Sequence, residues 1–336
     1  MLNDLEQPQF LPHLAHKIAT NRSEIVLMTC TADAASARMC TNTVSRMDAL
    51  GLARHTLVFT DKAENCDGAL ARVAPATCAW SSRVLERAPA ESVSLKRYFD
   101  GRFRFYESKK LYVAQLVRSG LHVLQADADV AWLQNPFPAL RRAPSSCALV
   151  VQRDLPIANA GMIFARGGRR AGERAMAEVA WRVGMFQKRP GVVKSLVSFP
   201  TGRVVYANSD DQTTLNDVII GLVNGRATFH AQSRYEAKNR HNPSGVADWG
   251  TTREARAYSN DLDAARRRMR RELGFQMYEV KDSNETICVA PRHIFAHAGE
   301  RGCLVHVAGA RGATAKQAAI AEAFKTSPPK KIAPPV

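Results

Sequence analysis

The chain alternates short apolar runs with longer stretches whose apolar residues repeat at helical spacing. The first run, Glu24–Thr29, precedes the stretch 34–50, in which Val44 and Met47 share a helix face, and a second run follows at His55–Phe59. Runs of this length and composition predict strands, and the spacing between them predicts a helix. Strand, helix and strand in this order form a βαβ unit, so we expect parallel pairing with a right-handed crossover.

The same alternation continues along the rest of the chain. The polar region 231–259 lacks apolar periodicity and predicts a long loop. We therefore expect an α/β fold with a mostly parallel central sheet flanked by helices. Strands are predicted at 77–80, 121–126, 148–152, 157–165, 286–290, 293–296 and 303–307, and helices at 109–118, 171–186, 215–222, 261–273 and from about Lys316.

Composition and charge indicate a globular protein with an anionic partner. The 336 residues allow one large or two ordinary domains, and 46% hydrophobic with 23% charged residues is typical of a folded chain. A formal charge of +16 favours a nucleotide, a nucleic acid or an acidic membrane surface. Five arginines between 266 and 271 wrap around the predicted helix 261–273, which favours a solvated helix. Because no pattern of a nucleic-acid-binding fold accompanies the charge, we expect no nucleic-acid partner.

The sequence carries no signal for a membrane span, a secretory leader or a zinc ribbon. No window reaches about 18 consecutive apolar residues, so we expect no transmembrane helix. Residues 1–22 lack the basic and apolar regions of a secretory signal and are interpreted as a lead-in. The Pro- and Lys-rich segment 326–336 predicts a disordered tail. Seven cysteines without any C-x-x-C argue against a zinc ribbon and leave the redox compartment open.

Two carboxylates, Asp127 and Asp129, follow directly after the apolar run 121–126. Ligands gather at the carboxyl ends of strands in an open parallel sheet, and residues two apart share a strand face. Both carboxylates can therefore reach one divalent cation, which would offset their desolvation beside an apolar strand. The apolar turn beyond them contains Pro136 and Pro138, which we expect to prevent a helix.

Other positions have an ordinary structural interpretation beside a chemical one. Gly161 inside a predicted strand indicates a bulge or a place where the backbone approaches a ligand. Lys109 and Lys110 suit a solvated helix face, and Asp210 suits the N-terminus of the helix behind it. His306 lies in an apolar strand, where a histidine is more often a hydrogen-bonded core residue than a metal ligand.

Taken in order, these pieces resemble a known enzyme family. The resemblance covers about residues 23–325 and implies a single domain of GT-A type, with a Rossmann-like sheet and a smaller acceptor-side subregion. It divides the domain into a nucleotide-binding half, 23–140, and a donor and acceptor half, 141–325. The chain resembles the nucleotide-diphospho-sugar transferase domain, and within it the family 77 glycosyltransferases, at Lys110, at Asp127–Phe137 (DADVAWLQNPF), at Asn159–Gly161, at Asp211 and Gln212, and at His306 and Lys316.

The resemblance implies a role for each of these positions. Asp127 and Asp129 are similar to the pair that binds Mn2+ or Mg2+ and, through it, the diphosphate. His306 is similar to the histidine that completes the metal site, with His297, nine residues earlier, as the alternative. Lys316 is similar to the lysine that contacts the diphosphate, and Lys110 is a second candidate for neutralising its charge. The donor sugar and reacting face are expected at Asn159, Gly161, Asp211 and Gln212, and the nucleotide base and ribose at Thr29, Cys30 and Thr31.

The implied activity is transfer of a sugar from a nucleotide-diphospho-sugar, such as a UDP-sugar, to a hydroxyl of a glycan or glycoprotein. Retention of anomeric configuration and a place in the Golgi lumen also follow from the resemblance, whereas a chain without an anchor also fits the cytoplasm. Breaking the sugar–diphosphate bond develops negative charge on the leaving oxygen, which a cation and a lysine can neutralise. One imidazole beside two carboxylates shifts the metal preference towards Mn2+.

Two other classes of function remain open. In phosphotransferases of the haloacid dehalogenase type an apolar strand also precedes Asp-x-Asp, which would make Asp127 the nucleophile, Asp129 the acid or base, and Asp210 or Asp211 a Mg2+ ligand. That motif normally opens its domain, whereas here a βαβ unit comes first. A basic, non-catalytic protein that binds polyanions or sugars is the other alternative.

Overall fold

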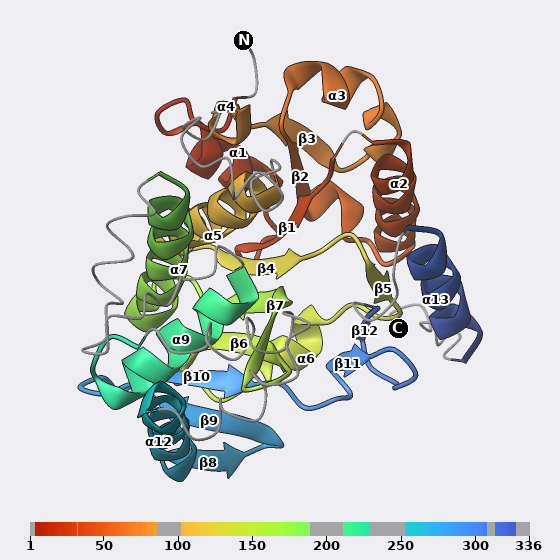
Figure 1. The fold of residues 1–336 in the computed structure, drawn as a ribbon. Coiled ribbons are helices and arrows are strands. Elements are labelled where there is room, and N and C mark those ends of the chain that lie inside the picture. The colour runs from red at the N-terminus through yellow and green to blue at the C-terminus, as the bar shows by residue number, and fades with distance from the viewer. Residues whose placement is uncertain are drawn as a thin grey trace, which may run out of the picture.

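A computed structural model of the chain describes residues 4–31, 33–85, 102–188, 211–228, 253–307 and 313–326. Within these ranges nine strands form one sheet in the order β3-β2-β1-β4-β7-β6-β10-β9-β8 (Figure 1). The strands are β1 (Glu24–Thr29), β2 (Thr56–Thr60), β3 (Thr77–Trp80), β4 (His122–Ala126), β6 (Cys147–Arg153), β7 (Ala158–Ala165), β8 (Met269–Glu272), β9 (Phe275–Glu279) and β10 (Thr286–Val289).

Most strands of this sheet run in the same direction. β3, β2, β1 and β4 pair in parallel, as do β6 and β10. β7 is antiparallel to both β4 and β6, and β9 is antiparallel to both β8 and β10. Only β7 and β9 of the sheet therefore run against the other described strands. The α/β fold with a mostly parallel sheet is confirmed, and so is the βαβ unit β1–α2–β2.

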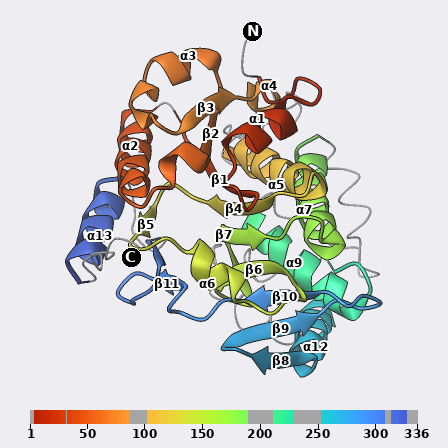
Figure 2. The same ribbon diagram turned by 180° about the vertical axis from the view of Figure 1, so that it is seen from behind.

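Helices cover both faces of the sheet (Figures 1 and 2). Ile25 and Leu27 of β1 pack in the layer with α5, α7 and α9, whereas Val26 and Met28 face the layer with α2 and α6. No helix in the described ranges is long and apolar enough to cross a membrane. The helices are α1 (Phe10–Ile18), α2 (Ala34–Ala49), α3 (Ala63–Asp67), α4 (Ser82–Leu85), α5 (Arg102–Arg118), α6 (Phe137–Arg141), α7 (Arg170–Lys188), α9 (Asp211–Asn224), α12 (Arg253–Arg267) and α13 (Ala313–Thr326), with short 3-10 turns η1 (Ala53–His55) and η2 (Ala71–Val73).

A second, three-stranded sheet lies beside the carboxyl end of β4. It has the order β11 (Phe295–His297), β12 (Leu304–His306) and β5 (Val130–Trp132). Because β12 is antiparallel to β5 with His306 opposite Val130, the C-terminal part of the chain meets the segment that follows Asp127. α13 packs on this sheet through apolar side chains, namely Ile320, Ala323 and Phe324.

The arginine-rich segment is not one helix. α12 ends at Arg267, and the chain then forms the hairpin of β8 and β9. The turn consists of Leu273 and Gly274, both with positive φ (49° and 83°), a conformation that joins adjacent antiparallel strands. The predicted helix 261–273 is therefore wrong beyond Arg267.

Proline placement explains a second difference from the predicted elements. Pro136 is the N-cap of α6 and Pro138 lies in its first turn, where a missing N–H removes no helical hydrogen bond. The two prolines thus begin a short helix instead of preventing one. α5 also starts earlier than predicted, at Arg102 instead of Lys109.

Several sequence expectations fall on residues that the structure does not describe. Asp210 and the tail beyond Thr326 lie outside the described ranges, as does most of the predicted loop 231–259. Of that loop, residues 253–259 belong to α12, so the loop prediction is wrong there. The lead-in 1–22 contains α1, which buries Leu11 and Ala15 against the main core.

Six of the seven cysteines form disulfide bonds. Cys30 pairs with Cys40, Cys66 with Cys78, and Cys147 with Cys288, while Cys303 is a buried free thiol. The bond between Cys147 and Cys288 joins β6 to β10 across 141 positions of sequence. Such bonds form and persist in oxidising environments, a point that the cysteine spacing alone leaves open.

Candidate functional site

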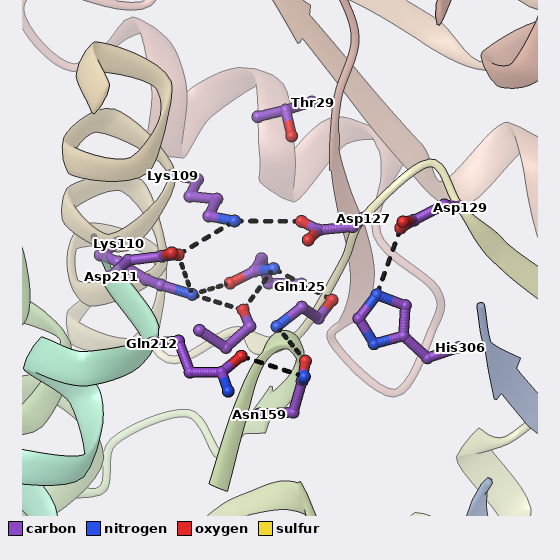
Figure 3. A network of polar contacts seen from close by, with 12 residues as sticks. Thr29, Lys109, Lys110, Gln125, Asp127, Asp129, Asn159, Asp211, Gln212 and His306 are labelled. Atoms are coloured by element: carbon purple, nitrogen blue, oxygen red, sulfur yellow. Dashed lines mark hydrogen bonds and ion pairs between the residues drawn. The ribbon is translucent and has the colours of Figure 1, made fainter. Parts of the chain in front are cut away.

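Asp127 and Asp129 lie in the connection between β4 and β5, at the carboxyl end of a strand whose last four residues are buried. Asp127 N–H donates to the carbonyl of Gly161 on the neighbouring β7, and Val307 N–H donates to the carbonyl of Asp129. Thr43 of α2 donates to the carbonyl of Ala128 between them. These bonds fix the backbone of both acidic residues, so their carboxylates hold defined positions (Figure 3).

The two carboxylates meet the imidazole of His306. Asp127, Asp129 and His306 each offer a ligand atom, and these atoms all lie within 4.8 Å of one another. His306 Nε2 lies 3.3 Å from Asp129 Oδ1. Gly161 leaves the space for this approach, because a Cβ there would lie 2.6 Å from His306 Cε1 and 2.9 Å from Asp127 Oδ2. Gly161 is thus a point of close approach between β7 and these two side chains, and β6 and β7 also shift register nearby.

The orientation of His306 suits a metal ligand. Its Nδ1 is 3.1 Å from Oε1 of the buried Gln152, which leaves Nε2 towards Asp129. His297 instead places Nε2 2.6 Å from the carbonyl of Arg153 and is not in the three-residue group. Two carboxylates and one imidazole form a mixed oxygen and nitrogen set that Mn2+ or Mg2+ can accept. These three residues therefore form a candidate metal site.

Two lysines hold the outer oxygens of the acidic pair. Lys316 Nζ, from the first turns of α13, is 2.6 Å from Asp129 Oδ2, and Lys109 Nζ is 3.0 Å from Asp127 Oδ1. Burial opposes ionisation of Asp129, but its contacts with His306 and Lys316 outweigh burial and lower the pKa of that carboxyl. Asp129 is therefore an anion in a nearly buried position, which suits it to a cation.

Lys109 and Lys110 are buried beside Asp211, not on a solvated helix face. Both lysines belong to α5, and Asp211 is the first residue of α9. Lys109 Nζ lies 3.0 Å and Lys110 Nζ 3.3 Å from Asp211 Oδ2. Lys110 Nζ also donates to the carbonyl of Ala160 and to Gln125 Oε1, so three acceptors surround it. Burial favours the neutral carboxyl of Asp211, but the two lysines outweigh it and lower its pKa. Lys109 thus connects the metal-ligand candidate Asp127 to Asp211 (Figure 3).

The amide side chains of Asn159 and Gln212 form a cluster next to this ion-pair network. Asn159 Nδ2 donates to Gln212 Oε1 at 3.1 Å and to Asp154 Oδ2 at 2.9 Å, and Gln212 Nε2 donates to the same Asp154 oxygen. Gly161 N–H donates to Asn159 Oδ1. The structure therefore brings Asn159, Gly161, Asp211 and Gln212 together with the acidic pair, although they come from β7 and α9.

The turn after β1 borders the same region. Thr29 ends β1, and Cys30 is buried in a disulfide with Cys40 of α2. Thr31 Oγ1 donates to Asp33 Oδ2, the residue whose other oxygen caps α2. Figure 3 places Thr29 above Lys109 and Asp127, on the strand beside β4.

Sequence reasoning missed part of this arrangement. Gln125, Gln152 and Asp154 were not singled out, and Lys109 was named only as part of a helix face. The sequence does mark the two glutamines, because each follows apolar residues within a predicted strand: Gln125 in LHVLQ and Gln152 in ALVVQ. A buried polar side chain requires a hydrogen-bond partner, so such interruptions indicate partners elsewhere in the chain.

Comparison with known families agrees with the motif analysis. The family model of nucleotide-diphospho-sugar transferases matches residues 54–189. The matched segment contains Lys109, Asp127, Asp129 and Asn159, whereas His306 lies beyond it. No curated protein matches this sequence. The narrower resemblance to family 77 stays a prediction.

Solved structures with similar chains are glycosyltransferases at low identity. The bifunctional glycosyltransferase WbbM in its apo form is 12% identical with a TM-score of 0.35, over 49% of this chain and 35% of that one. The galactosyltransferase LgtC, in complex with donor and acceptor sugar analogues, is 14% identical with a TM-score of 0.30, over 43% and 57%. Mouse xyloside xylosyltransferase 1 in its apo form is 12% identical with a TM-score of 0.30, over 48% and 75%. The match spans only about a third of WbbM and little more than half of LgtC.

Proposed function

We propose that this chain transfers a sugar from a nucleotide-diphospho-sugar to a hydroxyl acceptor with a divalent cation, on the premise that residues 54–189 match the nucleotide-diphospho-sugar transferase family. The observation that carries the proposal is the convergence of Asp127, Asp129 and His306 at the end of β4. The donor is proposed to be a UDP-sugar, the cation Mn2+ or Mg2+, and the acceptor a glycan or glycoprotein. Retention of anomeric configuration is part of the same proposal.

The acidic pair and His306 would hold the cation, which when bound would stabilise the negative charge of a departing diphosphate. Lys316 is placed to contribute to the same task. Its ammonium lies against Asp129. A diphosphate held by a cation at these carboxylates would therefore come within reach of this flexible side chain. A hydrogen bond from that ammonium strengthens as charge develops on the leaving oxygen.

Asp211, Asn159 and Gln212 would border the donor sugar. Asp211 is ionised and buried, and both of its lysine partners keep it in place. The amides of Asn159 and Gln212 orient each other and share Asp154, so they are preorganised to hold sugar hydroxyls. Lys110, which is surrounded by three protein acceptors, supports Asp211 in this scheme, while Thr29, Cys30 and Thr31 would face the nucleoside.

The phosphotransferase alternative assigns Asp210 or Asp211 to a Mg2+ ion, and Asp210 lies outside the described residues. In the described residues Asp211 is instead bound by Lys109 and Lys110, and the candidate metal group contains His306 in its place. Both ammonium groups lie at one oxygen of Asp211, whereas Asp127 and Asp129 are each approached by one lysine in the described residues. This arrangement favours glycosyl transfer over a dehalogenase-type mechanism.

The test is calorimetric titration of a panel of sugar nucleotides, with and without Mn2+, combined with an assay of nucleotide release. We expect one UDP-sugar to bind only with the metal, and Asp127→Asn to weaken that binding by about tenfold or more. The matched control is Asp263→Asn, which removes an exposed carboxylate of α12. If no UDP-sugar binds and Asp127→Asn changes no metal-dependent affinity, the proposal fails. Release of phosphate from phosphomonoesters would support the phosphotransferase.

A further inference from the structure

Gln152 places a primary amide near the end of β6, directly after a run of buried apolar residues. Its side chain has no exposed surface, and its neighbours on β6 are Leu149, Val150 and Val151. Burying an amide costs free energy unless its donors and acceptor are paired. The contacts of Gln152 therefore show what the amide does.

Those contacts fix the direction of the amide. Gln152 Nε2 donates to the carbonyl of Ala296 at 2.8 Å, and only the NH2 end of an amide can make that bond. The carbonyl end, Oε1, is then directed at His306 Nδ1, 3.1 Å away. Reversing the amide would place its oxygen against the Ala296 carbonyl oxygen, which is repulsive. The backbone of β11 thus determines which end of Gln152 meets the histidine.

The amide direction in turn determines the form of the imidazole. Because Gln152 Oε1 can only accept, His306 Nδ1 must carry the hydrogen. In the neutral ring Nε2 then has a free lone pair, and it is Nε2 that lies 3.3 Å from Asp129 Oδ1. A lone pair facing a carboxylate is unfavourable by itself and favourable when a cation lies between them.

We propose that Gln152 is a positioning residue that holds His306 in its Nδ1–H form and so sets the affinity of the site for a divalent cation. The inference rests on the proposed metal site and adds a residue outside the ligand set. Gln152 also joins β6 of the main sheet to β11 of the small sheet. It therefore fixes His306, which belongs to the small sheet, relative to Asp127 and Asp129 at the end of β4.

The experiment measures Mn2+ binding to the full chain by electron paramagnetic resonance in three variants. Gln152→Met keeps the volume but removes the acceptor, and we expect it to weaken Mn2+ binding by about 10- to 100-fold. Gln152→Glu keeps an oxygen opposite Nδ1 and, as the neutral acid that burial favours, an O–H donor to the Ala296 carbonyl, so it should retain most of the affinity. His297→Ala removes the other histidine near Gln152 and should leave the affinity unchanged, because His297 is bound to the Arg153 carbonyl.

A second readout reports on the imidazole without any metal. In protein labelled with 15N-histidine at pH 8, the His306 signal should show the Nδ1–H form, and Gln152→Met should move it towards the Nε2–H form. The His306 signal is identified by its loss in His306→Gln. Thermal unfolding of each variant verifies that the chain is folded.

The outcomes separate this inference from the proposed function. If the wild-type chain binds no Mn2+, the metal-dependent function is overturned, and the histidine signal alone then decides the role of Gln152. If wild type binds Mn2+ and folded Gln152→Met binds it equally well with an unchanged His306 signal, the positioning role is wrong. Equal losses in folded Gln152→Met and Gln152→Glu would also overturn it, because they would indicate packing and not hydrogen-bond acceptance.

Discussion

Gly161 lies where the ligands of the candidate metal site come closest to the backbone of β7. We expect Gly161→Ala to displace His306 and Asp127, because the added methyl would lie 2.6 and 2.9 Å from their atoms. The variant should lose Mn2+ affinity by more than about tenfold while remaining folded. Metal titration and circular dichroism test this. Ala165→Gly, on the same strand but away from the site, is the control, and an unchanged affinity in Gly161→Ala would contradict the expectation.

Lys109 forms ion pairs with both Asp127 and Asp211, so its charge contributes to the stability of the fold as well as to the site. We expect Lys109→Met to lower the free energy of unfolding by about 3–5 kcal/mol, because it leaves Asp211 with one of its two lysines. Urea unfolding measures the change.

An exposed ion pair provides the control for that measurement. Lys325→Met breaks a contact with Glu322 on the outer face of α13 and should change stability by less than about 0.5 kcal/mol. Adding Asp211→Asn to Lys109→Met should recover part of the loss, since the buried charge is then gone. An equal loss of unfolding free energy in Lys109→Met and Lys325→Met would show that the buried ion pairs stabilise the fold no more than the exposed one.

At the scale of single residues, the sequence predicts those site positions whose signal is local. Asp127 and Asp129 follow a strand with one residue between them, and Gly161 interrupts another strand. The partners of Lys109 and Gln152 cannot be predicted in the same way, because Asp211 and His306 lie far along the chain. Only the fold shows which buried polar group faces which.

At the scale of elements, the hairpin of β8 and β9 contains a turn with an unfavourable residue. Leu273 has φ of 49° and is 70% exposed, so it gains little from burial and adopts a backbone conformation that costs a leucine about 1 kcal/mol. We expect Leu273→Asn to raise the free energy of unfolding by up to about 1 kcal/mol, because asparagine before glycine suits this turn.

Thermal unfolding tests the hairpin prediction. Gly274→Ala, at φ of 83°, should lower the melting temperature and serves as the opposite case. A lower melting temperature for Leu273→Asn would contradict the turn assignment.

The predicted elements succeeded where burial alone sets the pattern. β1 was predicted with its full range, and α2, β2 and β7 within one residue at each end, because their apolar positions face a core on one or both sides. The prediction was wrong for residues 268–273, since arginines suit an exposed helix and an exposed strand equally well. The deciding signal there was the Leu273–Gly274 turn and the alternation of Phe275 and Met277, both buried on β9.

At the scale of the whole molecule, the disulfide pattern gives a count that is simple to verify. Seven cysteines and three bonds leave one thiol, that of Cys303. Protein produced in an oxidising compartment, denatured and alkylated without reductant, should therefore gain one label by mass spectrometry, and seven after reduction. Labelling of three or more sites without reductant would contradict the bonding pattern.

The bond between Cys147 and Cys288 also has a consequence for how a cell makes this protein. The other two pairs are 10 and 12 positions apart, so each can close soon after leaving the ribosome. Cys147 has to wait for a partner that is synthesised 141 residues later, while four other cysteines are already present. Until then Cys147 can form a wrong bond with one of them. Recombinant yield should therefore depend on a disulfide isomerase supplied together with the growing chain.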